Sequence, residues 1–256
     1  MILALDVGNT ETVVGLFHDE TLHAHWRVST RPERTVDEMG LLLRALIREA
    51  GADDTAVSGA GIASVVPPLT PVIAEACRRY LHADVVVIDA ASGLPIRLDV
   101  EEPLTVGADR IVNTLAAARL YAADTIAVDF GTATTFDCIG ADGVFRGGVI
   151  TPGIQTGAET LIRRTAKLPR VDIDQPHQVM GRRTETAIQS GIFFSAVDAV
   201  DGIVARIREE WGAPDILVVA TGGLASLVAP HCRSIDRIEP FLTLHGIRLA
   251  FEHLRG

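Results

Sequence analysis

Two short segments of this sequence combine a carboxylate with glycine and small polar residues. They are Asp6–Thr10 (DVGNT) and Asp129–Thr135 (DFGTATT). Each follows a short apolar run, which predicts a carboxylate at the end of a buried strand and a hairpin whose backbone N–H groups and hydroxyls can hold phosphate. The carboxylate can also hold Mg²⁺ through water. One such segment is ordinary turn chemistry, but two copies favour a phosphate site.

Two further segments offer contacts to a ligand. Gly107–Arg110 (GADR) is expected at the start of a helix, where Asp109 could act as a general base and Arg110 could bind an anionic group. Alternatively, Asp109 is only a favourable first-turn charge. Thr221–Gly223 ends an apolar strand, and its glycines would let a nucleotide base or ribose approach the backbone, although a plain strand-to-helix turn has the same pattern.

The elements that must position these segments follow from the spacing of apolar residues. Thr35–Glu38 matches a capping box, and apolar residues then recur at helical spacing, which predicts a helix. Up to Ala90 the order is three strands of a meander, this helix, a strand, a helix opened by Pro67–Pro68 and a last strand. The strands are expected at 2–8, 13–17, 22–28, 56–65 and 85–90, with the second helix ending near residue 81.

A second pass of the same pattern begins near Thr125. Strands are expected at 126–130, 134–139, 144–150 and 215–221, and helices at 153–166, 184–211 and 244–254. Asp6 and Asp129 are 123 positions apart, close to half of the chain, which indicates an internal repeat. We therefore expect an α/β protein with two duplicated mixed-sheet domains, 1–115 and 116–256, joined by a helix starting near Ala108. The binding site is expected in a cleft between them, with the two carboxylates facing each other.

Composition excludes several classes of protein. Apolar residues make up 48% and charged residues 22%, which are globular values, and no apolar run approaches the ~20 residues of a membrane span. The net charge of −10 without a basic cluster argues against nucleic-acid binding. The N-terminus lacks a signal-peptide pattern, so a cytoplasmic location is expected. Cys77, Cys138 and Cys232 are widely spaced, which predicts buried apolar thiols rather than disulfides or a metal site.

The ordered set of segments resembles the type III pantothenate kinase family over nearly the whole chain. Besides the four segments above, the resemblance includes Gly147–Gly153 (GGVITPG), Gly181–Thr184 (GRRT) and Phe241–Arg248 (FLTLHGIR). It implies the duplicated ribonuclease-H-like fold shared with actin, hexokinase and acetate kinase, and usually a homodimer. It also implies transfer of the γ-phosphoryl group of ATP to the primary hydroxyl of pantothenate, the first step of coenzyme A synthesis.

The resemblance further implies a role for individual residues. Asp109 matches the proton acceptor, Asp129 a ligand of a monovalent cation (K⁺ or NH₄⁺), and Asp6 is expected to hold Mg²⁺. Pantothenate contacts are implied for Gly107, Ala108, Asp109, Arg110 and Thr184, the last near the dimer interface. Nucleotide contacts are implied for Asp6, Val7, Gly8, Asn9, Thr10, Glu11, Thr12, Val13, Gly131, Thr132, Gly222 and Gly223.

One position departs from the family pattern. Val100 stands where many members carry a tyrosine that lines the pantothenate site, which affects the expected substrate affinity. Two other functions therefore stay open: a nucleotide-binding regulatory or scaffold protein on the same fold, and a kinase or phosphohydrolase of this superfamily with another small substrate. The long apolar segment that begins at Thr184 predicts a dimer, with a helix buried inside its own domain as the alternative.

Overall fold

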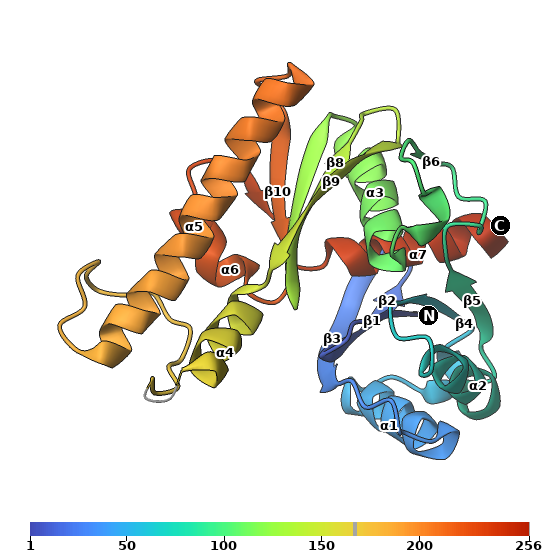
Figure 1. Ribbon diagram of the computed structural model, residues 1–256. Coiled ribbons are helices and arrows are strands. Elements are labelled where there is room, and N and C mark those ends of the chain that lie inside the picture. Colours follow the sequence, from blue (N-terminus) through green and yellow to red (C-terminus); the bar gives the residue numbers. More distant parts are fainter. Residues whose placement is uncertain (166–167, 256) are drawn as a thin grey trace. The chain divides into compact units, whose positions relative to one another are not determined.

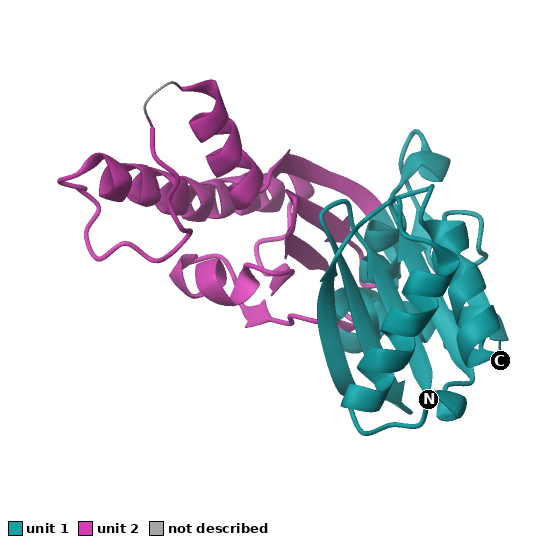
Figure 2. Ribbon diagram, turned by 90° about the horizontal axis from the view of Figure 1, so that it is seen from below, with its two compact units in different colours: residues 1–120, 143–145, 242–256 teal, residues 121–142, 146–241 magenta. Residues whose placement is uncertain are grey.

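The computed structural model describes residues 1–165 and 168–255, and the chain forms two compact units. Unit 1 comprises residues 1–120, 143–145 and 242–256, and unit 2 comprises 121–142 and 146–241 (Figure 2). The predicted halves, 1–115 and 116–256, differ from these units mainly at the C-terminus. The last helix returns to unit 1, where its apolar face packs on the first sheet.

The sheet of unit 1 has five strands in the order β3-β2-β1-β4-β5 (Figure 1). β1 is antiparallel to β2, which is antiparallel to β3, whereas β1–β4 and β4–β5 are parallel pairs. The central strand is thus the one that ends in Asp6 and Val7. The strands are β1 (Ile2–Val7), β2 (Glu11–His18), β3 (Thr21–Ser29), β4 (Gly59–Ser64) and β5 (Asp84–Ile88).

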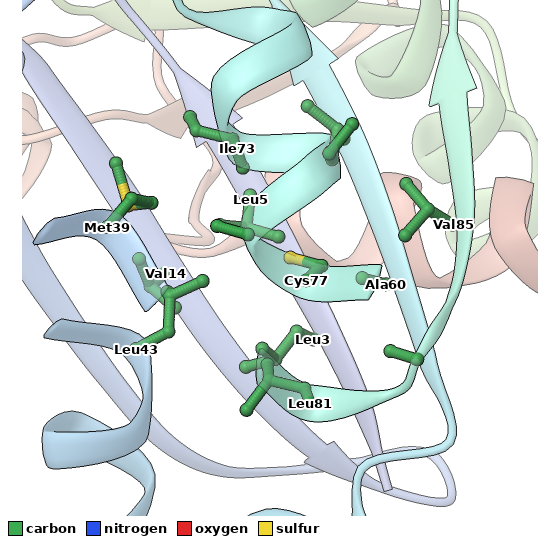
Figure 3. Packing of buried hydrophobic residues seen from close by; sticks show 14 of the residues in the cluster. Leu3, Leu5, Val14, Met39, Leu43, Ala60, Ile73, Cys77, Leu81 and Val85 are labelled. Atoms are coloured by element: carbon green, nitrogen blue, oxygen red, sulfur yellow. The ribbon is translucent and has the colours of Figure 1, made fainter. Parts of the chain in front are cut away.

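Helices cover both faces of this sheet. Alternate residues of β4 face opposite sides: Ala60 and Ile62 join the core beneath α1 (Val36–Glu49) and α2 (Thr70–Leu81), which Figure 3 shows in part. Gly59 and Gly61 face α7 (Leu242–Arg255), where a Cβ on either glycine would overlap or crowd its side chains. The glycines therefore allow α7 to lie close to the sheet.

The capping box of the first helix is confirmed. The Thr35 hydroxyl accepts the N–H of Glu38 at 3.2 Å, and Glu38 Oε2 accepts the N–H of Thr35 at 2.8 Å. The hydrogen bonds from Thr35 lower the pKa of the Glu38 carboxyl. α2 begins at Thr70, later than Pro67–Pro68 predicts, because the chain first passes through a turn that ends at Leu69.

The sheet of unit 2 repeats the topology of the first. Its order, read as β9-β8-β7-β10-β11, matches β3-β2-β1-β4-β5, and this confirms the predicted internal repeat. A short strand, β6 (Arg97–Leu98), extends the order by pairing in parallel with Val144 and Phe145, the first residues of β9. The other strands are β7 (Thr125–Phe130), β8 (Ala133–Ile139), β9 (Val144–Pro152), β10 (Leu217–Thr221) and β11 (Arg237–Ile238).

The remaining helices include the connector α3 (Ala108–Tyr121) and, in unit 2, α4 (Ile154–Arg164), α5 (Thr184–Trp211) and α6 (Ala225–Val228). Short 3₁₀ turns span Asp54–Ala56, Pro103–Thr105 and Ala229–His231. α5 has the predicted limits and ends at Gly212, which is left-handed with φ of 67°. α4 is shorter than the predicted 153–166, and Ala166 lies outside the described residues.

Within the described part of the chain, α5 alone is long and apolar enough to cross a membrane by length and composition. Only 28% of its apolar window is buried in the structure. Phe193, Val197 and Val200 nevertheless lie in the core of unit 2, and Asp201 Oδ1 accepts the Ser234 hydroxyl at 2.7 Å. These contacts are those of a core helix that leaves a second apolar face uncovered.

The three cysteines are buried and none forms a disulfide, as predicted. Burial raises the pKa of the Cys77 thiol to about 12, and burial together with Asp201 and Asp198 raises that of Cys232 to about 12. These thiols therefore serve as small apolar side chains.

Candidate active site

The first hairpin, between β1 and β2, is held at several backbone atoms. Gly8 donates its N–H to the Glu11 carbonyl at 3.0 Å, which closes the turn. The Thr30 hydroxyl donates to the Gly8 carbonyl at 2.7 Å, and the Thr30 N–H donates to the Thr10 carbonyl at 3.0 Å. Thr30 lies just beyond β3 and gave no signal in the sequence, because its partners are distant along the chain.

The residues of this hairpin that are predicted to contact a nucleotide differ in which of their atoms can reach a ligand. Asn9, Thr10 and Glu11 are exposed, so their side chains and backbone can both reach a ligand. Val7 is fully buried in the core, and Thr12 is 1% exposed with its hydroxyl 2.9 Å from that of Thr30. These two residues can therefore contribute only through their backbone.

Asp109 lies at the same sheet edge as this hairpin. Val65, directly after β4, donates its N–H to the Val7 carbonyl at 3.0 Å. A Cβ placed on Gly107 would lie 3.6 Å from Val65 Cγ1 and would overlap Asp109 Oδ1. The start of α3 is therefore beside the carboxyl ends of β1 and β4, and Gly107 leaves the space that the Asp109 carboxylate occupies.

Arg110 is held by an aromatic ring that the sequence did not indicate. Its guanidinium carbon lies 4.9 Å from the centroid of the Phe145 ring, a cation–π contact. The Phe145 carbonyl accepts the N–H of Asp99 at 2.8 Å, and Val100 follows directly. Phe145 thus contacts Arg110 through its ring and binds Asp99, the residue before Val100, through its carbonyl.

The second hairpin, between β7 and β8, is held in a similar way. Gly131 donates its N–H to the Ala133 carbonyl at 3.1 Å. The Thr132 carbonyl accepts the Gly153 N–H at 3.1 Å and the Thr156 hydroxyl at 2.7 Å. A Cβ on Gly153 would overlap the carbonyl oxygens of this turn, so the chain that enters α4 can approach only as glycine.

Asp129 and Gly222 meet at the carboxyl edge of the second sheet. β7 and β10 pair in parallel with Thr221 opposite Asp129. Gly222 has φ of 91°, and a Cβ there would overlap Asp129 Oδ1. Gly223 is exposed one residue later, before α6 begins at Ala225. The predicted Asp129, Gly131, Thr132, Gly222 and Gly223 therefore share one edge of unit 2.

The residues beside Asp129 fit a monovalent cation. The Thr221 hydroxyl is 1% exposed and has no hydrogen-bond partner within residues 1–165 and 168–255. A buried hydroxyl oxygen next to a carboxylate is the kind of donor that K⁺ accepts. Among the same described residues, no three His, Cys, Asp or Glu side chains gather as a metal site. A Mg²⁺ ion carried by a nucleotide does not need one, because it takes most of its oxygens from water and phosphate.

Thr184 lines a cavity of about 1020 Å³ between α4 and α5 in unit 2. It is exposed at the first turn of α5. Thr134 and Gly153, which flank the second hairpin, also line the cavity. Most of the other lining residues are apolar, including Phe136, Ile154, Leu161, Ala187, Ile188, Ile192 and Ala199.

Gly222→Ala is expected to disturb the Asp129 edge specifically. A Cβ would strain a left-handed backbone, at a cost of about 1–2 kcal/mol, and would also push against the carboxylate. We expect a lower melting temperature and at least tenfold weaker binding of a nonhydrolysable ATP analogue.

Gly212→Ala is the matched control for this substitution. Gly212 also has positive φ, 67°, but nothing lies within 4 Å of its added Cβ. It should lose similar stability while binding the analogue normally. Equal losses of binding in both variants would show that Gly222 has no special relation to the site.

Comparisons with known proteins agree with this geometry. Residues 2–206 match the family described as type III pantothenate kinase. A type III pantothenate kinase of Moorella thermoacetica is 46% identical over 254 residues, 98% of this chain and 99% of that protein. One from Myxococcus xanthus is 45% identical over 253 residues, 98% of each chain. The structure of a ROK hexokinase from Thermus thermophilus matches with a TM-score of 0.52 at 14% identity, covering 100% and 99% of the two chains, which confirms the predicted fold class. The chain belongs to the type III pantothenate kinase family.

Proposed function

We propose that this protein transfers the γ-phosphoryl group of ATP to pantothenate and forms 4'-phosphopantothenate, the first step of coenzyme A synthesis. One observation carries the proposal: within unit 1, Asp109 lies at the same sheet edge as the first phosphate hairpin. A general base must be near the reacting phosphate, since phosphoryl transfer depends on positioning and charge stabilisation.

A coupled assay of ADP release tests the proposal directly. Purified protein with ATP should release ADP only when pantothenate is added. Binding of ATP without turnover would instead support the regulatory or scaffold protein. Release of ADP with a different small alcohol, but not with pantothenate, would support another kinase of this fold.

The proposed nucleotide contacts are described for each unit by itself. In unit 1, Asp6 to Val13 offer backbone donors to phosphate. In unit 2, Gly131–Thr132 offer such donors, and Gly222–Gly223 give a base and ribose a close approach. Asp6 holds Mg²⁺ through water, and Asp129 with the Thr221 hydroxyl holds K⁺ or NH₄⁺. The metal ions offset phosphate charge, and the protein residues orient the nucleotide.

The proposed pantothenate site is formed around the start of α3. Asp109 accepts the proton of the primary hydroxyl as the phosphoryl group is transferred, and Gly107 and Ala108 shape the backbone beside it. Arg110, held against the Phe145 ring, binds the carboxylate of pantothenate. Val100 covers less area than a tyrosine would, which favours a higher KM for pantothenate than in relatives that carry the aromatic residue.

We further propose a cytoplasmic homodimer in which a second copy covers the cavity between α4 and α5, called the groove from here on. The groove is lined mainly by apolar residues, and α5 has more apolar surface than unit 2 buries. Thr184 lies at the rim of this groove, so its proposed contact with pantothenate would be made near the dimer interface.

Asp109→Asn should lower turnover by about 10²–10⁴-fold, because it removes the proton acceptor and keeps the shape of the side chain. Binding of ATP should be retained, since the hairpin contacts are unchanged. Steady-state kinetics, calorimetric titration of an ATP analogue and thermal melting of the variant measure the three quantities.

Asp37→Asn is the control for Asp109→Asn, because Asp37 is also the second residue of a helix. It should lose stability, as Asp37 pairs with Arg79 at 3.0 Å, but retain turnover. If Asp109→Asn loses only about 0.3–1 kcal/mol of stability and turns over normally, Asp109 is merely a first-turn charge.

Activity should require K⁺ or NH₄⁺ in addition to Mg²⁺. The chain has a net charge of −10, so the polyphosphate needs mobile cations to offset repulsion. Replacing K⁺ by Na⁺ at constant ionic strength should lower kcat/KM for ATP at least tenfold. Full activity in sodium buffer verified to contain neither K⁺ nor NH₄⁺ would contradict the cation site.

Ala199→Glu should convert a dimer into a monomer. Ala199 is exposed on α5 and lines the groove, where a buried carboxylate would oppose association. Ala205→Glu, an exposed position of the same helix outside the groove lining, should leave the dimer intact. Light scattering at micromolar concentration distinguishes these states, and a monomeric wild-type protein would reject the dimer.

A further inference from the structure

We propose that the hydroxyls of Thr30 and Thr156 are positioning groups, each of which aims a backbone N–H donor of the hairpin in its own unit at phosphate. The inference rests on the nucleotide site proposed above and adds two residues to it. Neither threonine belongs to a hairpin, and each donates its hydroxyl at 2.7 Å to a hairpin carbonyl, Gly8 for Thr30 and Thr132 for Thr156.

The planar trans peptide explains how such a bond could act on a ligand. In each peptide unit the C=O of one residue and the N–H of the next point in opposite directions. When Thr30 holds the Gly8 carbonyl, the Asn9 N–H is directed to the other side. When Thr156 holds the Thr132 carbonyl, the Ala133 N–H is directed in the same manner. Each hydroxyl thus fixes a donor that belongs to its hairpin.

The two hydroxyl bonds support corresponding hairpins of the repeated fold but end at different carbonyls. At the 123-residue offset Gly8 corresponds to Gly131, whereas Thr132 corresponds to Asn9. Thr30 follows β3 and Gly153 follows β9, and these are the third strands of the two meanders. The residue just beyond the strand donates its N–H to a hairpin carbonyl in both units, Thr30 to Thr10 at 3.0 Å and Gly153 to Thr132 at 3.1 Å. In both units, therefore, the chain just beyond the third strand supports the hairpin.

The units differ in which residue supplies the hydroxyl, and sterics give the reason. Thr30 provides both its N–H and its side chain to the first hairpin. Gly153 has no room for a side chain, because a Cβ would overlap the carbonyl oxygens of Gly131 and Thr132. The hydroxyl comes instead from Thr156, in the first turn of α4. Different residues thus provide a hydroxyl to the hairpin of each unit.

The hydrogen bonds within each hairpin agree with the proposed direction of its remaining N–H donors. The Gly8 and Gly131 N–H groups are used within their own turns, bonding to the carbonyls of Glu11 and Ala133. The Gly8, Thr10 and Thr132 carbonyls, which would repel phosphate oxygens, accept hydrogen bonds from protein donors. A released carbonyl could rotate toward the phosphates and replace an attractive N–H by a repulsive oxygen.

Thr156→Val removes the hydroxyl and keeps the β-branched shape, whereas Thr156→Ser keeps the hydroxyl. We expect Thr156→Val to raise the Kd of a nonhydrolysable ATP analogue by about threefold to tenfold, the usual effect of one hydrogen bond. The Kd of adenosine, which has no phosphate, should stay within about twofold. Thr156→Ser should restore binding of the analogue. Thr30→Val should behave like Thr156→Val, and Thr30→Ser like Thr156→Ser.

Thr125→Val is the matched control in the same unit. Its hydroxyl donates to the Ala123 carbonyl at 2.8 Å, and the residue is fully buried at the start of β7, the end opposite to Asp129. It should lose stability without changing either Kd. Calorimetry for the analogue, saturation-transfer NMR for adenosine and thermal melting supply the measurements.

The possible results separate this inference from the proposed function. If the wild-type protein does not bind the ATP analogue, the nucleotide site itself is wrong and the positioning role falls with it. If the wild-type protein binds but Thr156→Val binds equally well, only the positioning role is overturned. Equal weakening of adenosine and the analogue, or failure of Thr156→Ser to restore binding, also overturns it, because the hydroxyl would then have only a general structural effect.

Discussion

Binding a polyphosphate in an acidic chain is the constraint on which the rest of this structure depends. The net charge is −10, and the sequence contains one lysine, Lys167, which lies outside the described residues. Backbone N–H groups can replace charged side chains only if they are numerous and held in place. The hairpins at Gly8 and Gly131, which we propose as phosphate sites, suit this requirement because residues outside the loops hold the Gly8, Thr10 and Thr132 carbonyls.

Close backbone approach is the second requirement, and particular glycines provide it. Gly153 lets the chain entering α4 reach the Thr132 carbonyl, and Gly222 lets the end of β10 pass Asp129 in a left-handed conformation. Gly107 leaves space for the Asp109 carboxylate at the start of α3. In each case a methyl group would occupy the volume of a functional oxygen, so these glycines act through contact as well as through backbone freedom.

The apolar character of α5 connects the core of unit 2 with the proposed dimer. One face of the helix completes the core through Phe193, Val197 and Val200. Another face lines the large groove with α4, and the exposed Val179 and Met180 lie in the chain before α5. A surface of this size and composition is costly in water, which is the physical basis for proposing that a second copy covers it. The same helix resembles a membrane span by composition because it has apolar surface beyond the face that packs in the core.

The sequence by itself determined the repeat, the order of the longer strands and helices, and the family, since these depend on local periodicity and on motifs whose residues are adjacent. It predicted both limits of α5 and the capping box at Thr35. It missed β6 and β11, because two-residue strands have no periodicity and form only when a neighbouring strand offers a partner. Only the tertiary structure decided that the C-terminal helix belongs to unit 1, that Phe145 supports Arg110, and that Thr30 and Thr156 hold the hairpins. These are contacts between residues far apart in the chain, and a single threonine or phenylalanine has no sequence context that reveals which carbonyl or cation it will meet.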